Sequence, residues 1–148
     1  KKFHVGIKAL VQDDEGKILL LQVNPNELKD NKHGTYWDLP GGRIKKGDTA
    51  EETLKKEIEE ELGSSKGLKI LGLFHGNISN IEIPVNGEKY GLVLFVYLCR
   101  LDSKQIKISV EHTDYKWASV GEAKNLLGIK FSKDFVEKLD SLKQHKVR

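Results

Sequence analysis

Three carboxylates in one short segment are the residues of this chain best suited to chemistry. Glu57, Glu60 and Glu61 stand at positions i, i+3 and i+4, so a helix would place them on one face. Like charges at this spacing repel by about 0.2–0.5 kcal/mol per pair. Sequences that keep such repulsion often hold a compensating cation, and hard divalent ions such as Mg²⁺ take carboxylate oxygens. The pattern indicates a divalent-metal site, although a solvated acidic helix face is the usual alternative for a run of Glu.

The acidic segment needs a helix and a preceding loop to position it. Thr49-Ala50-Glu51-Glu52 has the form of a capping box, which predicts a helix that starts at Thr49. Gly63 predicts where this helix ends. Apolar or small residues recur every four positions and predict its core-facing stripe: Ala50, Leu54, Ile58 and Leu62. Pro40-Gly41-Gly42 predicts a turn in the segment before the helix. The carboxylates of Glu57, Glu60 and Glu61 are expected to flank the stripe, at the border between core and cleft.

The segment from Gly42 to Ser64 resembles the Nudix box, Gly-x5-Glu-x7-Arg-Glu-U-x-Glu-Glu-x-Gly-U, in which U is a bulky aliphatic residue. Identity and spacing both match at Gly42, Glu57, Ile58, Glu60, Glu61 and Gly63. Three positions depart from the pattern, because Asp48 replaces Glu, Lys56 replaces Arg and Ser64 replaces the last aliphatic residue. The approach, Trp37-Asp38-Leu39-Pro40-Gly41, is also similar to that of the family.

The resemblance implies a fold and an activity. We expect one α/β domain over residues 1–148, a Nudix-type α/β/α sandwich with a mixed β-sheet, one catalytic helix and C-terminal helices. The family hydrolyses the diphosphate linkage of nucleoside diphosphate derivatives with Mg²⁺ or Mn²⁺. By this resemblance Glu57, Glu60 and Glu61 are catalytic residues and metal ligands, with the carbonyl of Gly41 as a further ligand.

Asp48 and Lys56 are supporting residues whose types differ from the family pattern. The family's Arg orients the box carboxylates, and Lys offers a compact point charge in place of a planar fork. Lys56 can still pair with Glu52 or neutralise Glu60, and Asp48 suits a helix N-terminus. We expect both changes to weaken activity without abolishing it, so that Lys56→Arg raises the catalytic rate.

A second group of polar residues follows far along the chain. Glu111-His112-Thr113-Asp114-Tyr115-Lys116-Trp117 is similar to the Glu-His-x-x-Tyr-Arg-Trp segment of dinucleoside tetraphosphate hydrolases and other Nudix members. Many members carry an acidic residue outside the box as base or metal ligand. Glu111 is the first candidate for this catalytic role and Asp114 the second, while capping of the next element is the structural alternative.

Substrate contacts are predicted around the glycine turn and at aromatic residues. Gly42 and Arg43 border the turn and are candidates to meet substrate phosphates. Trp37 and Tyr90 are candidates to stack on a base, with core packing as the alternative for each.

The amino-acid composition narrows the classes of protein to which this chain can belong. The 148 residues are 38% hydrophobic and 32% charged, which is typical of a folded domain. The net charge of +3 is too weak to indicate nucleic-acid binding but suits a phosphate-bearing small molecule. No apolar run reaches the roughly 18–20 residues of a membrane span. The single cysteine, Cys99, excludes an internal disulfide and lies in an apolar run, so we expect a cytoplasmic protein. We expect it to be a monomer or a homodimer.

The pattern of apolar residues predicts the other elements. Strands are expected over 5–11, 18–23, 36–39, 69–74, 78–83, 91–101 and 115–118, and helices over 120–127 and 132–142. Residues 24–35 are expected to form a long loop, and residues 143–148 a frayed tail.

Several functions remain open within this reading. Nucleoside triphosphates, dinucleoside polyphosphates and nucleotide sugars are all possible substrates, and residues 111–117 favour dinucleoside polyphosphates slightly. The alternative is a Nudix-fold nucleotide-binding or regulatory module with weak or lost catalysis, motivated by Asp48 and Lys56. A Nudix-type isoprenoid diphosphate isomerase is a third choice, but it needs a cysteine acid in the pocket and Cys99 is poorly placed for that role.

Overall fold

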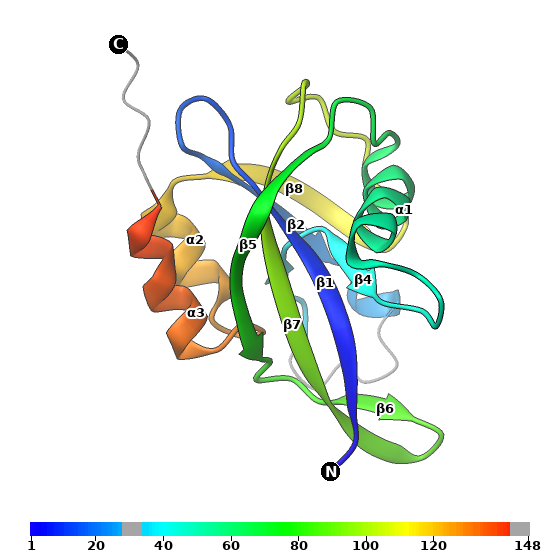
Figure 1. Ribbon diagram of the computed structural model, residues 1–148. Coiled ribbons are helices and arrows are strands. Elements are labelled where there is room, and N and C mark those ends of the chain that lie inside the picture. Colours follow the sequence, from blue (N-terminus) through cyan, green and yellow to red (C-terminus); the bar gives the residue numbers. More distant parts are fainter. Residues whose placement is uncertain (28–33, 143–148) are drawn as a thin grey trace.

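The computed structural model describes residues 1–27 and 34–142. Its strands are β1 (Phe3–Val11), β2 (Ile18–Val23), β3 (Trp37–Asp38), β4 (Gly41–Arg43), β5 (Lys69–Ile78), β6 (Ile83–Val85), β7 (Glu88–Arg100) and β8 (His112–Ala118). Its helices are α1 (Ala50–Leu62), α2 (Val120–Leu127) and α3 (Lys133–Lys138), with short 3-10 turns at Pro25–Glu27 and Leu139–Ser141 (Figure 1).

The strands form two sheets. The larger has the order β4-β1-β7-β5, with β6 paired to β7, and the smaller has the order β3-β2-β8. The larger sheet is mixed, because β1 runs parallel to β7 while β4, β5 and β6 pair antiparallel to their neighbours. β1 therefore lies in the middle of the chain's main sheet, with β4 and its two glycines directly beside it.

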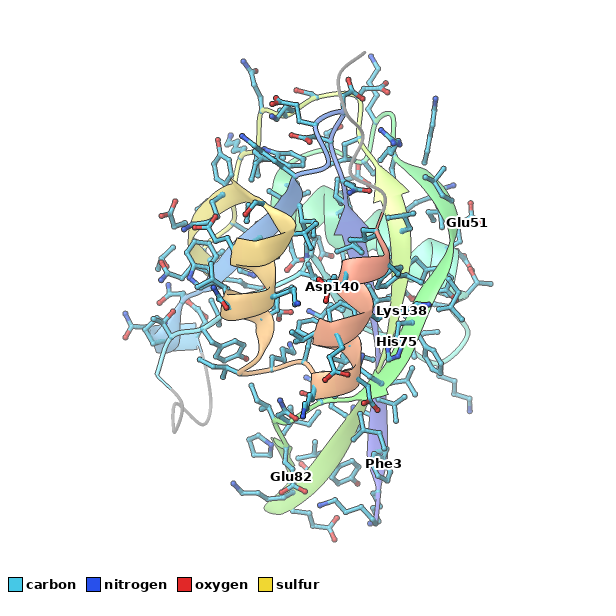
Figure 2. All side chains as sticks on the ribbon, turned by 90° about the vertical axis from the view of Figure 1, so that its left-hand side faces the viewer. Phe3, Glu51, His75, Glu82, Lys138 and Asp140 are labelled. Carbon is cyan, nitrogen blue, oxygen red and sulfur yellow. The ribbon has the colours of Figure 1, made fainter. Side chains whose placement is uncertain are left out.

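Helices cover the sheets from two sides. α1 lies on one side and α2 with α3 on the other (Figure 1), and Figure 2 views the α2–α3 side directly. Leu54, Ile58 and Leu62 of α1 pack with Ile7 and Leu19 in one buried cluster. A second cluster joins Leu10, Leu94, Leu127, Phe131 and Phe135 beneath α2 and α3. Alternate residues of β1 thus serve both clusters, which follows from the two-residue period of a strand. The mixed α/β fold is confirmed.

Several predicted boundaries are wrong. β8 begins at His112, three residues before the predicted start at 115. β5 continues to Ile78, so the predicted strand over 78–83 is replaced by a link and the short strand β6. β7 begins at Glu88 because Asn86 (φ 50°) and Gly87 (φ 79°) form a tight hairpin turn. The last helix ends at Lys138 and continues as a 3-10 turn. Parts of the predicted loop and the predicted tail, residues 28–33 and 143–148, lie outside the described residues.

Two expectations from composition have structural counterparts. Cys99 is fully buried in β7, and burial raises the pKa of its thiol to about 12, as fits a core residue. Within residues 1–27 and 34–142, no helix is long and apolar enough to cross a membrane.

Candidate active site

Helix α1 begins and ends where the sequence predicts. The Thr49 hydroxyl accepts a hydrogen bond from the Glu52 N–H (3.1 Å), and the Glu52 carboxylate accepts one from the Thr49 N–H (3.0 Å), so the capping box is complete. Gly63 ends the helix in the left-handed conformation with φ 86°. Between these caps, the buried stripe fixes the rotation of α1 and presents Glu57 and Glu61 toward β4.

Two glycines let β4 approach the carboxylates of α1. The Gly41 N–H donates to Glu61 Oε1 at 2.7 Å. Gly41 has a φ of 145°, and a Cβ there would lie 2.1 Å from the carbonyl oxygen of Ile7, so only glycine fits. A Cβ on Gly42 would lie 2.4 Å from the carboxyl carbon of Glu57. Gly41 and Gly42, predicted to lie in a turn, are thus part of strand β4, and they pack directly against two of the predicted metal ligands.

Replacing Gly42 tests this close approach. We expect Gly42→Ala to displace the Glu57 carboxylate, lowering kcat by about tenfold or more with little change in stability, because the flexible end of Glu57 can move. Steady-state kinetics and thermal unfolding measure the two effects. Gly121→Ala is the matched control, since a Cβ at Gly121 meets no atom within 4 Å. Unchanged kcat in Gly42→Ala would show that the position of Glu57 is not critical.

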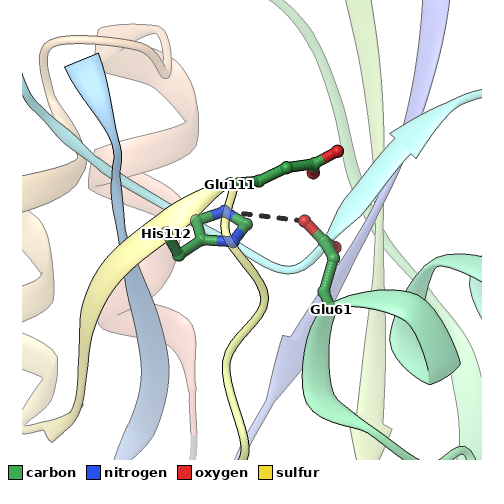
Figure 3. Close-up of side chains that lie close together, drawn as sticks. All are labelled: Glu61, Glu111 and His112. Carbon is green, nitrogen blue, oxygen red and sulfur yellow. Dashed lines mark ion pairs between the residues drawn. The ribbon is translucent and has the colours of Figure 1, made fainter. Parts of the chain in front are cut away.

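The loop before β8 brings a third carboxylate to α1. Figure 3 shows Glu111 and His112 facing Glu61. His112 Nε2 lies 3.5 Å from Glu61 Oε2, and the candidate ligand atoms of Glu61, Glu111 and His112 all lie within 4.8 Å of one another. Glu61 and His112 are buried, whereas Glu111 is exposed. Oxygen and imidazole ligands in this arrangement can hold a divalent ion.

Burial and mutual repulsion disfavour charge on the acidic groups of α1. Burial raises the pKa of Glu61 to about 8, against the opposing effects of the Lys8 ammonium and the Gly41 N–H. The pKa of Glu57 is also raised, first by burial and then by Glu60, with Glu111 adding to the repulsion. Burial lowers the pKa of His112 to about 4, so its imidazole is neutral near pH 7. A cation would relieve this repulsion, so the residues present fit a divalent metal.

A cavity of about 460 Å³ opens beside these groups. Its lining includes Gly41, Gly42, Arg43, Glu61 and Glu111, together with residues 81–86 in and around β6. The volume lies within the roughly 300–1,000 Å³ usual for small-molecule sites.

The floor of the cavity holds a buried cluster of Lys8, Asp38 and Lys130. Asp38 Oδ2 lies 3.1 Å from Lys8 Nζ and 2.6 Å from Lys130 Nζ. Burial acts to raise the pKa of Asp38, but the Lys130 and Lys8 ammonium groups outweigh it and hold that pKa at about 2. The carboxylate is therefore charged at all ordinary pH values.

Four predicted site residues are not among the described residues that line the cavity: Glu57, Glu60, Trp37 and Tyr90. Glu60 is exposed on α1. Trp37 packs against the core under α2, with Lys116 Nζ 5.0 Å from its ring centroid. Tyr90 stacks edge-on against His4 at 5.0 Å.

The two residues that depart most from the family pattern, Asp48 and Lys56, pair with each other at 3.0 Å. Glu52 and Glu60 act on Lys56 only as additional nearby charges that raise its pKa after Asp48. Asp48 is shorter than the Glu of the family pattern and Lys56 is shorter than its Arg, and the two shorter side chains form an ion pair with each other.

Sequence reasoning missed several residues of the cavity. Asp38 and His112 were predicted only as members of longer motifs, without a role of their own. Lys8 carried a usable signal, because a lysine in the middle of an apolar strand is seldom buried without a partner. Lys130 carried none, since it follows α2 in an ordinary connecting segment.

Comparisons with known proteins identify the family of this chain. A model of the NUDIX domain matches residues 2–139. The nucleoside triphosphatase NudI of Escherichia coli O139:H28 is 30% identical over 84 residues, which are 55% of this chain and 60% of the relative. That alignment spans less than two thirds of the relative's length.

Solved structures show the same fold. The MutT protein of Methanosarcina mazei Go1 superposes with a TM-score of 0.76 at 22% identity, covering 95% of each chain. The dihydroneopterin triphosphate pyrophosphohydrolase of E. coli superposes with a TM-score of 0.68 at 19% identity, covering 95% of this chain and 97% of the other. With its matching domain model, fold and acidic helix, the chain belongs to the Nudix family.

Proposed function

We propose that this protein hydrolyses a phosphoanhydride bond of a nucleotide with the help of a divalent metal ion. The observation that carries the proposal is the meeting of acidic residues from two distant segments in the lining of the cavity, Glu61 of α1 and Glu111 before β8, together with Gly41 and Gly42. A solvated acidic helix face would not bury Glu61 or hold it with a backbone N–H.

The metal would be held by Glu57, Glu60 and Glu61, with the carbonyl of Gly41 as a further ligand. Carboxylate oxygens are the ligands that Mg²⁺ and Mn²⁺ prefer. The bound ion supplies charge neutralisation at the phosphate oxygens and lowers the pKa of water. The hydrogen bond from Gly41 to Glu61 holds one carboxylate in place for this purpose.

Other residues of the cavity have roles in the same reaction. Glu111 is exposed and close to Glu61, so it is suited to take the proton of the attacking water. Arg43 lines the cavity and is exposed, so its guanidinium can bind substrate phosphates. His112 is neutral and buried beside Glu61, and it restricts the position of that carboxylate.

The name of the similar NudI relative favours nucleoside triphosphates among the open substrates. The cavity volume of about 460 Å³ is that of a small-molecule site. Dinucleoside polyphosphates and nucleotide sugars belong in the same screen.

The test is a screen of these nucleotides with Mg²⁺ or Mn²⁺, in which product masses are read after reaction in ¹⁸O water. We expect turnover of at least one nucleoside triphosphate, loss of turnover with EDTA, and a strong reduction in Glu60→Gln. Nucleotide binding without turnover in either metal would instead support the binding-module alternative. Turnover that persists equally in Glu60→Gln would exclude the proposed metal ligand.

A further inference from the structure

The floor of the cavity contains more positive than negative charge in its buried cluster. Lys8 and Lys130 share a single carboxylate oxygen of Asp38. The exposed fractions of the three side chains are only 7%, 11% and 6%, in the order Lys8, Lys130 and Asp38. Lysine is almost never buried to this extent unless it is paired, so the cluster is a built feature of the site.

The two ammonium groups have donors to spare. Each ammonium carries three N–H donors. Lys8 uses two of them, on Asp38 and on the Leu39 carbonyl oxygen at 3.2 Å. Lys130 uses one, on Asp38, and its ammonium lies 5.9 Å from the ring centroid of Tyr36. Within the described residues, one donor of Lys8 and two of Lys130 have no protein acceptor, so a ligand with acceptor atoms would satisfy them.

The surroundings of the cluster indicate which part of a nucleotide lies there. The acidic residues of the cavity lining are assigned to the phosphates by the proposed function, on which this step rests. Beside Lys130 the surroundings are apolar, because its ammonium lies 5.9 Å from the Tyr36 ring centroid and Tyr36 packs with Val23 and Ile81 in one buried cluster. All three of these apolar residues line the cavity. A flat, uncharged base with oxygen acceptors can pack on these apolar walls and accept hydrogen bonds from the spare donors of the lysines.

We propose that Lys8 and Lys130 select nucleotides whose base presents a carbonyl oxygen where other bases present an amino group. Guanine, uracil and thymine carry O6 or O4 at this position, while adenine and cytosine carry an NH₂ donor. An ammonium group can donate to the oxygen but has no lone pair for the amine. Asp38 is a positioning residue that holds both lysines at the floor of the cavity.

The test compares kcat/KM for GTP and UTP with that for ATP and CTP. We expect the wild type to prefer the two carbonyl bases by about tenfold or more. Lys130→Gln should bring the ratio toward one, because an amide can also accept a hydrogen bond from an amino group. Lys130→Arg should keep the preference, since a guanidinium only donates. Lys133→Gln is the matched control, because that exposed lysine lies on α3.

Two outcomes would overturn the inference. One is a wild type without preference between the two pairs of bases. The other is an equal loss for all four nucleotides in Lys130→Gln with folding intact by thermal unfolding, which would assign the lysine to the phosphates.

A binding measurement separates this inference from the proposed function. Titration calorimetry with GMP, UMP, AMP and CMP in EDTA needs no turnover. Suppose that the protein hydrolyses none of the nucleotides but binds GMP and UMP more tightly than AMP and CMP, and that Lys130→Gln removes this preference. The inference about the lysines would then stand, and the proposed hydrolase activity would be rejected. Hydrolysis of all four nucleotides without any base preference would instead support the hydrolase and reject the inference about the lysines.

Discussion

Glu61→Gln is expected to lower kcat by about 10²- to 10³-fold while leaving the fold intact. Loss of one metal ligand removes several kcal/mol of transition-state stabilisation, which corresponds to that range of rate. The glutamine carbonyl can still accept the hydrogen bond from Gly41, so β4 should keep its place beside α1. Because the replaced carboxyl is buried and its pKa is raised to about 8, a neutral amide suits the position, and Tm in EDTA should not fall.

The control for this change lies two residues earlier on the same helix. Glu59→Gln alters an exposed carboxylate and should leave kcat close to that of the wild type. Addition of Mg²⁺ should raise the Tm of the wild type and of Glu59→Gln, but raise that of Glu61→Gln less. Wild-type turnover in Glu61→Gln would exclude this carboxylate from the chemistry.

Asp38→Ala is expected to destabilise the protein by about 3–5 kcal/mol, since it leaves two buried ammonium groups without their counterion. Urea denaturation at pH 7 measures the loss. The pKa of about 2 lies below the ordinary 3.8, so the stability that Asp38 contributes is present above about pH 4. This contribution should disappear as pH falls toward 2, and the wild type and the variant should converge there.

The matched control is an exposed ion pair. Asp140 pairs with Lys124 at 2.7 Å on the surface of the α2–α3 side, and Asp140→Ala should cost less than about 1 kcal/mol. Replacing the whole cluster by Lys8→Met, Asp38→Leu and Lys130→Met together should recover much of the stability lost in Asp38→Ala. If the triple variant is as unstable as the single one, packing and not unpaired charge determines the loss.

Helix α1 could be predicted from the sequence because the residues that start it, end it and orient it lie close together in the chain. The capping box at Thr49, the glycine stop at Gly63 and the apolar stripe of α1 all act within one or two turns of helix. The same periodicity predicted that Glu57, Glu60 and Glu61 flank the apolar stripe. The structure confirms the helix, and in it Glu61 is buried and Glu57 half-buried, whereas Glu60 is exposed. The mixed fold followed from resemblance over the box and from the strand pattern.

The cavity floor could not be predicted because its members meet only through tertiary structure. Lys130 reaches Asp38 across 92 positions of sequence, and no periodic pattern encodes such a contact. The start of β8 was missed for a related reason. His112 pairs with Val23 of β2, next to an irregularity in the register between Gln22 and Val23 that alternation alone does not reveal.

The short hairpin of β6 and β7 has a consequence for how this protein can diversify. It supplies one wall of the cavity, yet its turn at Asn86 and Gly87 lies apart in sequence from α1 and from Glu111. Insertions at such a turn are tolerated, because they lengthen a surface connection and leave the core in place. This wall and the acidic residues of α1 therefore lie in separate stretches of the sequence, so a longer hairpin would change the shape of the cavity without altering α1.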